Sequence, residues 1–105
     1  MKESFAEKVY RITAQIPKGK VSTYRDVAHQ LRCKAYRAVG QALNKNPYAP
    51  KVPCHRIIAS DGSLGGFASG LAKKKQLLRQ EGVSIKNNSI DLKTFGYQWN
   101  SAKRI

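Results

Sequence analysis

Two neighbouring residues, Cys54 and His55, offer the chemistry of a nucleophile beside a base. A thiol has an ordinary pKa of about 8.5, so only a few per cent of it is thiolate at neutral pH, and the thiolate is the reactive form. An adjacent imidazole that accepts or relays the proton raises that fraction. Pro53 fixes one backbone dihedral before the cysteine and limits where the sulfur can point. A Cys-His pair considered alone is more often structural than catalytic. The choice between these two roles therefore depends on the elements that surround the pair.

The Cys-His pair follows a stiff segment. Three prolines fall within residues 46–53 and exclude a helix there. We therefore expect an active-site loop over about residues 46–58 that delivers Cys54. A glycine-rich stretch follows at residues 64–67, and its two adjacent glycines suggest that a ligand or another backbone passes close by.

Helical periodicity surrounds this loop. Ser4 and Glu7 form a capping-box pattern, and Thr23 is placed to cap a later helix. Apolar residues at helical spacing predict amphipathic helices over about residues 4–16, 24–31, 35–45 and 71–81. The fold class is therefore mainly α, with a small β element.

The second and third predicted helices are typical of a helix-turn-helix unit over about residues 24–45. The third helix has a polar and basic outer face made of Tyr36, Arg37, Gly40, Gln41, Asn44 and Lys45. A mid-helix glycine costs about 1 kcal/mol relative to alanine, so Gly40 indicates that a backbone or a groove wall comes close. An ordinary helical hairpin with a solvated face is the alternative.

The net charge of the chain indicates which kinds of molecule it can bind. Twenty Lys and Arg residues against six Asp and Glu give the 105-residue chain a formal net charge of +14 and a pI near 10.2. This excess indicates a polyanionic partner, nucleic acid before an acidic membrane surface, although a merely lysine-rich surface is the bland alternative. No apolar run approaches the ~20 residues that span a bilayer, and the N-terminus has no signal-peptide core. We therefore expect a monomeric intracellular protein, cytoplasmic or at the nucleoid, with no membrane partner.

Several motifs then occur in a recognisable order. They are Gly19-Lys20-Val21-Ser22-Thr23-Tyr24, Arg37-Ala38-Val39-Gly40, Asn46-Pro47, Val52-Pro53-Cys54-His55-Arg56-Ile57-Ile58, Asp61-Gly62, Leu64-Gly65-Gly66-Phe67 and Leu77-Leu78-Arg79-Gln80-Glu81-Gly82. Over about residues 4–86 the chain resembles the DNA-binding, catalytic domain of the O6-alkylguanine-DNA alkyltransferases, the methylated-DNA–protein-cysteine methyltransferases. The resemblance implies a winged-helix-like helix-turn-helix fold, one domain over residues 1–105, no cofactor and no metal. It also implies that the usual N-terminal α/β domain of this family is lacking.

The resemblance implies a direct-reversal DNA repair reaction that each molecule performs once. Cys54 attacks the alkyl carbon of O6-alkylguanine and keeps the group as a thioether. His55 deprotonates Cys54 through a water, and Glu81 orients the imidazole, which is the logic of nucleophile, base and orienting group. Asn46 ties the third helix to the active-site loop.

The same resemblance implies how double-stranded DNA is bound. Arg37 enters from the minor groove and fills the gap that the flipped nucleotide leaves, while Tyr24 crowds the target phosphate and donates to the base. Backbone carbonyls around Cys54 and Ile57 accept from the guanine amine, and the backbone N–H of Ala68 faces O6. The implied DNA-binding set is Tyr24, Arg37, Gly40, Gln41 and Lys45, and the implied alkylguanine pocket is Tyr24, Val52, Ile57, Phe67, Ala68 and Lys74.

The main alternative lies within the same family. Short alkyltransferase-like proteins bind alkylated guanine without transfer, signal to nucleotide excision repair and commonly carry tryptophan in place of the cysteine. The chain has their size and an aromatic tail at Tyr97-Gln98-Trp99, but it keeps Cys54, which favours an active alkyltransferase. Other repair proteins are further candidate partners in either case.

Two unrelated interpretations are weaker. A cysteine hydrolase would not explain the helix-turn-helix pattern or the charge. A metal site built from His29, Cys33, Cys54 and His55 lacks the usual C-x₂₋₄-C spacing of its ligands.

Overall fold

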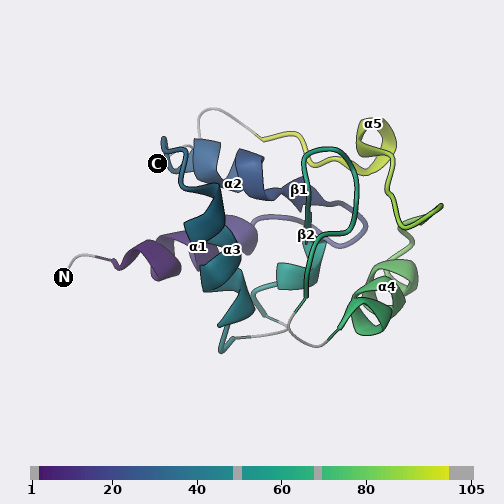
Figure 1. Cartoon of the computed structure of the whole chain (residues 1–105), viewed down its shortest axis with the longest axis horizontal. Coiled ribbons are helices and arrows are strands. Elements are labelled where there is room, and N and C mark those ends of the chain that lie inside the picture. Colours follow the sequence, from purple (N-terminus) through teal and green to yellow (C-terminus); the bar gives the residue numbers. More distant parts are fainter. Residues whose placement is uncertain (1–2, 49–50, 68–69, 100–105) are drawn as a thin grey trace.

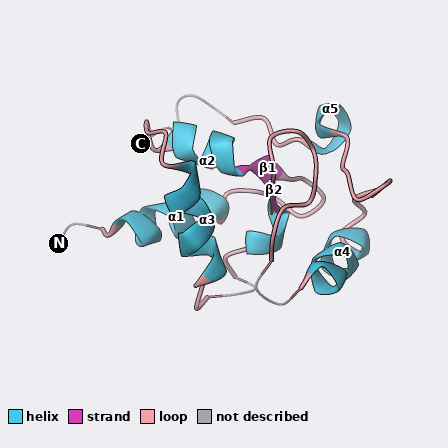
Figure 2. Cartoon of the chain, in the orientation of Figure 1, coloured by secondary structure: helices cyan, strands magenta, loops and turns pink. Residues whose placement is uncertain are grey.

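The computed structural model describes residues 3–48, 51–67 and 70–99. This part of the chain contains five α-helices and one pair of short strands. Figures 1 and 2 show how these elements are arranged. In chain order the elements are α1 (Phe5–Thr13), β1 (Ser22–Thr23), α2 (Tyr24–Gln30), α3 (Tyr36–Asn44), the 3₁₀ turn η1 (Cys54–Arg56), β2 (Ile57–Ile58), α4 (Leu71–Gln80) and α5 (Leu92–Phe95). The predicted fold class, mainly helical with a small β element, is confirmed.

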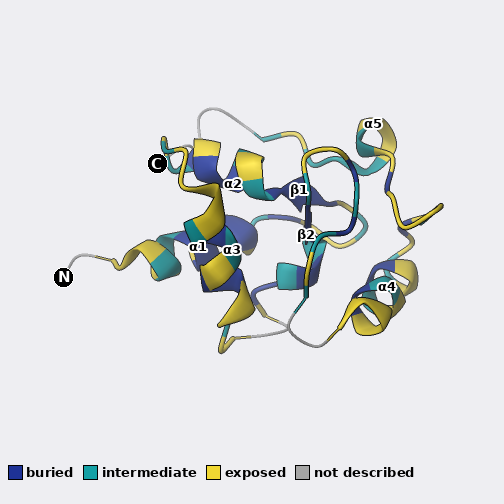
Figure 3. Ribbon diagram, viewed as in Figure 1, coloured by how far each residue is buried: buried dark blue, intermediate teal, exposed yellow. Residues whose placement is uncertain are grey.

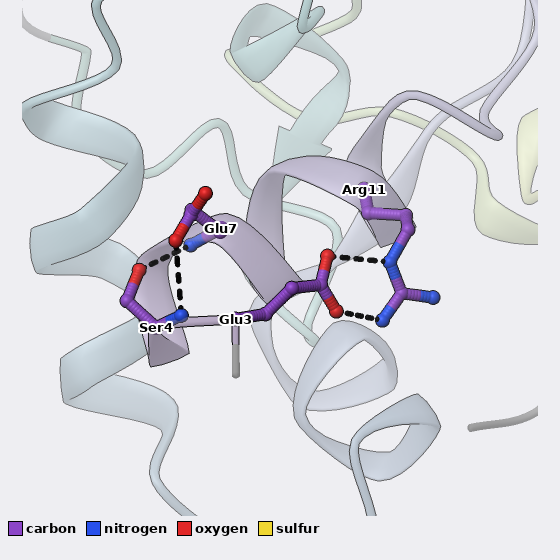
Figure 4. A network of polar contacts seen from close by, with 4 residues as sticks. All are labelled: Glu3, Ser4, Glu7 and Arg11. Atoms are coloured by element: carbon purple, nitrogen blue, oxygen red, sulfur yellow. Dashed lines mark hydrogen bonds and ion pairs between the residues drawn. The ribbon is translucent and has the colours of Figure 1, made fainter. Parts of the chain in front are cut away.

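Helix α1 begins with the predicted capping box (Figure 4). The Ser4 hydroxyl accepts from the Glu7 N–H at 3.1 Å, and the Ser4 N–H donates to the Glu7 carboxylate at 3.0 Å. Both are backbone donors that a helix start otherwise leaves without partners. Arg11, in the last turn of α1, reaches back to the Glu3 carboxylate with its Nε 2.9 Å from Oε2.

The prediction that the first helix runs to residue 16 is wrong at its end, because α1 stops at Thr13. The N–H groups of Gln15 and Ile16 bond to carbonyls three residues back, at 3.0 and 3.1 Å, which tightens the chain into 3₁₀-type turns. Ile16 nevertheless stays buried, with 1% of its surface exposed. The apolar spacing therefore continued beyond the helix that it predicted.

The strands β1 and β2 pair in parallel, with Ser22 opposite Ile57, and they separate two apolar cores. Successive strand residues point to opposite faces, so Ile57 belongs to the core under α1, α2 and α3, and Ile58 to the core under α4. Figure 3 shows buried residues on each of these helices, and α1, α2 and α3 pack against one another. Because η1 immediately precedes β2, Cys54 and His55 lie at the junction of the two cores.

The segment after α4 returns to β1. Val21 donates to the Phe95 carbonyl at 2.9 Å and accepts from the Tyr97 N–H at 2.7 Å, and Trp99 donates from its ring to the Ser22 hydroxyl at 3.0 Å. The aromatic tail thus packs on the body of the protein, on the strand that precedes α2.

Candidate active site and nucleic-acid interface

Asn46 fixes the segment that carries the cysteine. Its side-chain amide donates to the Val52 carbonyl at 2.8 Å and accepts from the Tyr48 N–H at 2.9 Å. The Cys54 N–H in turn donates to the same Val52 carbonyl at 2.9 Å. Residues 49–50 lie outside the described part, but these contacts join the end of α3 to η1 through one side chain.

Replacing Asn46 with alanine should therefore loosen η1. The substitution leaves the Tyr48 N–H without its partner and the Val52 carbonyl with the Cys54 N–H alone, so we expect a loss of about 1–3 kcal/mol in the free energy of unfolding, together with slower chemistry at Cys54. Urea denaturation measures the first effect, with Asn44→Ala, which removes an exposed amide at the end of α3, as the matched control. Equal stabilities of the two variants would contradict this account of Asn46.

His55 is held beside Glu81. Only 5% of the His55 side chain is exposed, and its Nε2 lies 3.0 Å from Oε2 of Glu81. The geometry of this contact is not that of a regular hydrogen bond, and Nε2 has no other hydrogen-bond partner among the described residues. Burial lowers the pKa of His55, and although Glu81 acts in the opposite direction, the net direction stays downward. The imidazole is therefore neutral at pH 7 and free to accept a proton.

Glu81 is an anion at the same pH. Burial opposes its charge, but hydrogen bonds from Arg56 and the proximity of His55 outweigh that effect and lower the pKa of the carboxyl. The Arg56 guanidinium donates from Nε to Oε1 at 2.9 Å and from a terminal nitrogen to Oε2 at 2.6 Å. Sequence reasoning assigned Arg56 no role; its only available signal was its place beside His55.

Lys74 is buried, with 0% of its surface exposed. Its ammonium donates to the carbonyls of Ile57, Leu64 and Gly66 at 2.7, 2.5 and 3.1 Å. Burial lowers its pKa to about 8, and the charge of a nearby Cys54 thiolate acts in the opposite direction. Lys74 thus joins β2 to the glycine-rich stretch, and it occupies the Ile57 carbonyl that was expected to accept from guanine.

The Tyr24 ring requires a glycine at position 65 but leaves ordinary contact distance at Gly40. The ring lies between α3 and the glycine-rich stretch, so that a Cβ added at Gly40 would lie 3.9 Å from the ring and one at Gly65 only 3.1 Å. Gly65 also has a φ of +68°, which a side chain rarely adopts. Burial raises the pKa of the Tyr24 hydroxyl, and a Cys54 thiolate raises it further. Tyr24 therefore lies between the cysteine and the outer face of α3.

That outer face lines an open hollow of about 670 Å³. Four residues of the expected DNA-binding set line it, namely Tyr24, Arg37, Gly40 and Gln41. Lys45 is exposed at the C-terminal end of α3 and does not line the hollow. The arrangement gathers the Arg37 cation and the Gln41 amide of α3 and the Tyr24 ring of α2 around one hollow.

The remaining pocket residues lie deeper or outside the described ranges. The side chains of Val52 and Ile57 belong to the first apolar core. Phe67 is half-buried, with the Lys74 ammonium 6.0 Å from its ring centre. Ala68, whose N–H was expected to face O6, is not among the described residues. The structure therefore brings Cys54, His55, Glu81, Tyr24 and Lys74 together, and places Val52 and Ile57 as their support.

The described ranges contain neither a cluster of metal ligands nor a membrane-spanning helix. No group of three or more His, Cys, Asp or Glu side chains there is placed to hold a metal ion. No helix in the same ranges has the length and apolar character needed to cross a membrane.

Comparison with known proteins agrees with this geometry. Residues 4–83 match the family described as 6-O-methylguanine DNA methyltransferase, DNA binding domain. The methylated-DNA–protein-cysteine methyltransferase of Sulfolobus acidocaldarius is 49% identical over 78% of this chain and 52% of its own length. The chain thus spans about half the length of the curated methyltransferases that it matches.

Two solved structures are similar in fold. The O6-methylguanine-DNA methyltransferase of Pyrococcus kodakaraensis superposes with a TM-score of 0.70 and 46% identity, over 77% of this chain and 47% of that one. Schizosaccharomyces pombe Atl1, solved in complex with damaged DNA containing O6-carboxymethylguanine, superposes with a TM-score of 0.83 and 31% identity, over 94% of this chain and all of Atl1. From the match over residues 4–83 and these relatives, the chain belongs to the 6-O-methylguanine DNA methyltransferase family.

Proposed function

We propose that this protein repairs DNA by transferring the alkyl group of O6-alkylguanine to Cys54, once per molecule. The observation that carries the proposal is the placement of His55: its Nε2 is 3.0 Å from Glu81, and its backbone adjoins that of Cys54 in η1. A neutral, buried imidazole beside a thiol and backed by a carboxylate is the arrangement of an activated nucleophile. Residues 1–105 would then act as one catalytic and DNA-binding domain.

The chemistry follows from these groups. His55 accepts the thiol proton, through a water, and Glu81 balances the imidazolium that forms. The thiolate then attacks the alkyl carbon in line, so that a sulfur–carbon bond forms as the carbon–O6 bond breaks. The electron pair of the broken bond stays on O6, and the guanine takes up a proton as it leaves. Because water does not displace a thioether, Cys54 is not regenerated.

DNA would dock on the outer face of α3. The alkyl carbon cannot reach a protein sulfur while its base is stacked, so the nucleotide must leave the helix. Arg37, exposed at the start of α3, would fill the space left in the duplex. Gly40, Gln41 and Lys45 would line the minor groove, and Tyr24 would stand beside the flipped nucleotide, between α3 and Cys54.

A second candidate function is lesion binding without transfer, with handover to other repair proteins. The observation in its favour is the superposition on Atl1, which covers all of that short protein. Cys54 argues for transfer, because a protein that only binds the lesion needs no nucleophile at this position.

Nucleoside analysis separates these functions. The protein is incubated with a duplex containing one O6-methylguanine, and the DNA is then digested to nucleosides. Transfer converts O6-methylguanine to guanine up to an amount equal to that of the protein and then stops. Retention of all O6-methylguanine despite binding would select the second function, and conversion beyond the amount of protein would contradict the single-use mechanism.

The net charge predicts how affinity depends on salt. With a formal charge of +14, phosphate contacts should supply most of the affinity. The logarithm of the binding constant should then fall linearly with the logarithm of salt concentration, with a slope of about −0.9 per phosphate neutralised. Alkylated and undamaged duplexes of the same sequence should show equal slopes, displaced by a constant preference, because Cys54 contacts the base. Fluorescence anisotropy measures both series; a flat response would contradict the nucleic-acid interpretation of the charge.

A further inference from the structure

Arg56 holds both oxygens of the carboxylate that faces His55. Its Nε lies 2.9 Å from Oε1 of Glu81, and a terminal nitrogen lies 2.6 Å from Oε2, the same oxygen that is 3.0 Å from His55 Nε2. Parallel bonds of this kind fix the plane of a carboxylate as well as its position. The side chains of Arg56 and Glu81 are only 16% and 13% exposed, so solvent screens the pair weakly.

Arg56 is itself anchored from a third direction. Its remaining terminal nitrogen donates to the Ile16 carbonyl at 2.8 Å, in the turn after α1. The backbone of Gly19 packs closely against the same region, because a Cβ at this position would lie 3.3 Å from the Glu81 carbonyl oxygen. The φ of Gly19 is +88°, which also favours glycine. The guanidinium therefore joins η1, the end of α4 and the turn after α1, and it cannot move without breaking contacts to all three.

The charges around His55 divide into two groups. Glu81 favours the protonated imidazole, whereas Arg56 on η1 and Lys74 on α4 disfavour it, in the same direction as burial. Cys54, the neighbour on η1, becomes an anion only when its proton leaves. With two cations opposing one anion, the described surroundings keep the ring neutral.

We propose that Arg56 is a positioning residue that keeps His55 in its neutral, proton-accepting form by binding the Glu81 carboxylate with two parallel hydrogen bonds. The kinetic test of this inference rests on the proposed function, because it measures alkyl transfer. If Arg56 were absent, His55 would be the sole remaining side-chain partner of Glu81 within the described contacts. A buried carboxylate whose one partner is an imidazole favours protonation of that imidazole. The imidazole would then be charged already and unable to take the proton of Cys54.

The kinetic test is the pH dependence of single-turnover transfer to an O6-methylguanine duplex. For Arg56→Gln we expect the acid limb to move up by about one pH unit, so that the rate falls by up to about tenfold at pH values below both midpoints and stays within about threefold of wild type near pH 8.5. Arg56→Lys keeps the charge and should keep the acid limb near its wild-type position, at a lower rate throughout. Arg11→Gln removes a similar two-bonded pair, with Glu3 on the exposed side of α1, and should change nothing.

A second measurement does not depend on transfer. The chain has two histidines, so NMR titration of the imidazole signals can follow His55 directly, with His29 as an internal control. The midpoint of His55 should rise in Arg56→Gln, while the His29 signals should stay unchanged. A rate that falls equally at all pH values, or a His55 midpoint that does not rise, would overturn the role given to Arg56. If the wild type fails to transfer but this midpoint rises, the proposed function fails and the control of His55 by Arg56 stands.

Discussion

Cys54→Ser is expected to lower the rate of alkyl transfer by about 10³-fold or more, and to leave binding of an O6-methylguanine duplex within about threefold. A hydroxyl holds its proton far more tightly than a thiol, so His55 cannot generate a comparable nucleophile from it. Binding should persist because the expected DNA contacts lie on α3 and at Tyr24, and the substitution leaves them in place. Single-turnover kinetics and anisotropy on the same duplex measure the two quantities.

Cys33→Ser is the matched control for this prediction. Cys33 is the other cysteine of the chain, partly exposed in the connection between α2 and α3. Its replacement should leave the transfer rate unchanged. Transfer that survives in Cys54→Ser, or disappears in Cys33→Ser, would assign the acceptor role to another residue.

Arg37→Ala and His55→Ala should separate DNA distortion from chemistry. Without Arg37, no side chain fills the gap that the flipped nucleotide leaves in the duplex. Because unstacking a base costs a few kcal/mol, repair in duplex DNA should slow by about 10²-fold. Reaction with a small O6-alkylguanine free base needs no flipping and should hardly change. His55→Ala removes the general base and should depress both reactions by similar factors of about 10² or more.

Both substrates are measured under single-turnover conditions, with Arg79→Ala as the control. Arg79 is exposed on α4, which Figure 1 shows well away from α3, so its loss removes a charge without touching the proposed interface. If Arg37→Ala and His55→Ala show the same ratio of the two rates, the roles assigned to these residues are wrong.

The helices were predictable because their signals are local. Ser4 with Glu7 and Thr23 cap α1 and α2 as expected, since a cap needs only a side chain and an N–H three residues on. The polar face of α3 followed from the 3.6-residue period alone. The parallel pairing of β1 with β2 was not predictable, because strands of two residues have no period and join positions 35 residues apart.

The parts of the site that depend on side-chain type could be predicted from the sequence. The parts that depend on contacts to backbone atoms could not. Cys54 and His55 were identifiable as a nucleophile beside a base, and the role expected of Glu81 came from the family resemblance. The burial of Lys74 was not, because its three partners are carbonyls, which every residue carries and no sequence pattern marks. Arg56 was overlooked for a related reason: its orientation depends on the Ile16 carbonyl and on the return of α4 to η1. Long-range contacts of this kind leave no local trace.

Intact-mass spectrometry after incubation with an excess of O6-methylguanine duplex tests the central claim most directly, since it observes the acceptor itself. The account predicts that the whole protein population gains one methyl group, that peptide mapping places this group on Cys54, and that no further gain follows on longer incubation. A protein that binds the duplex and keeps its original mass, or that carries the methyl group on any residue other than Cys54, would contradict it.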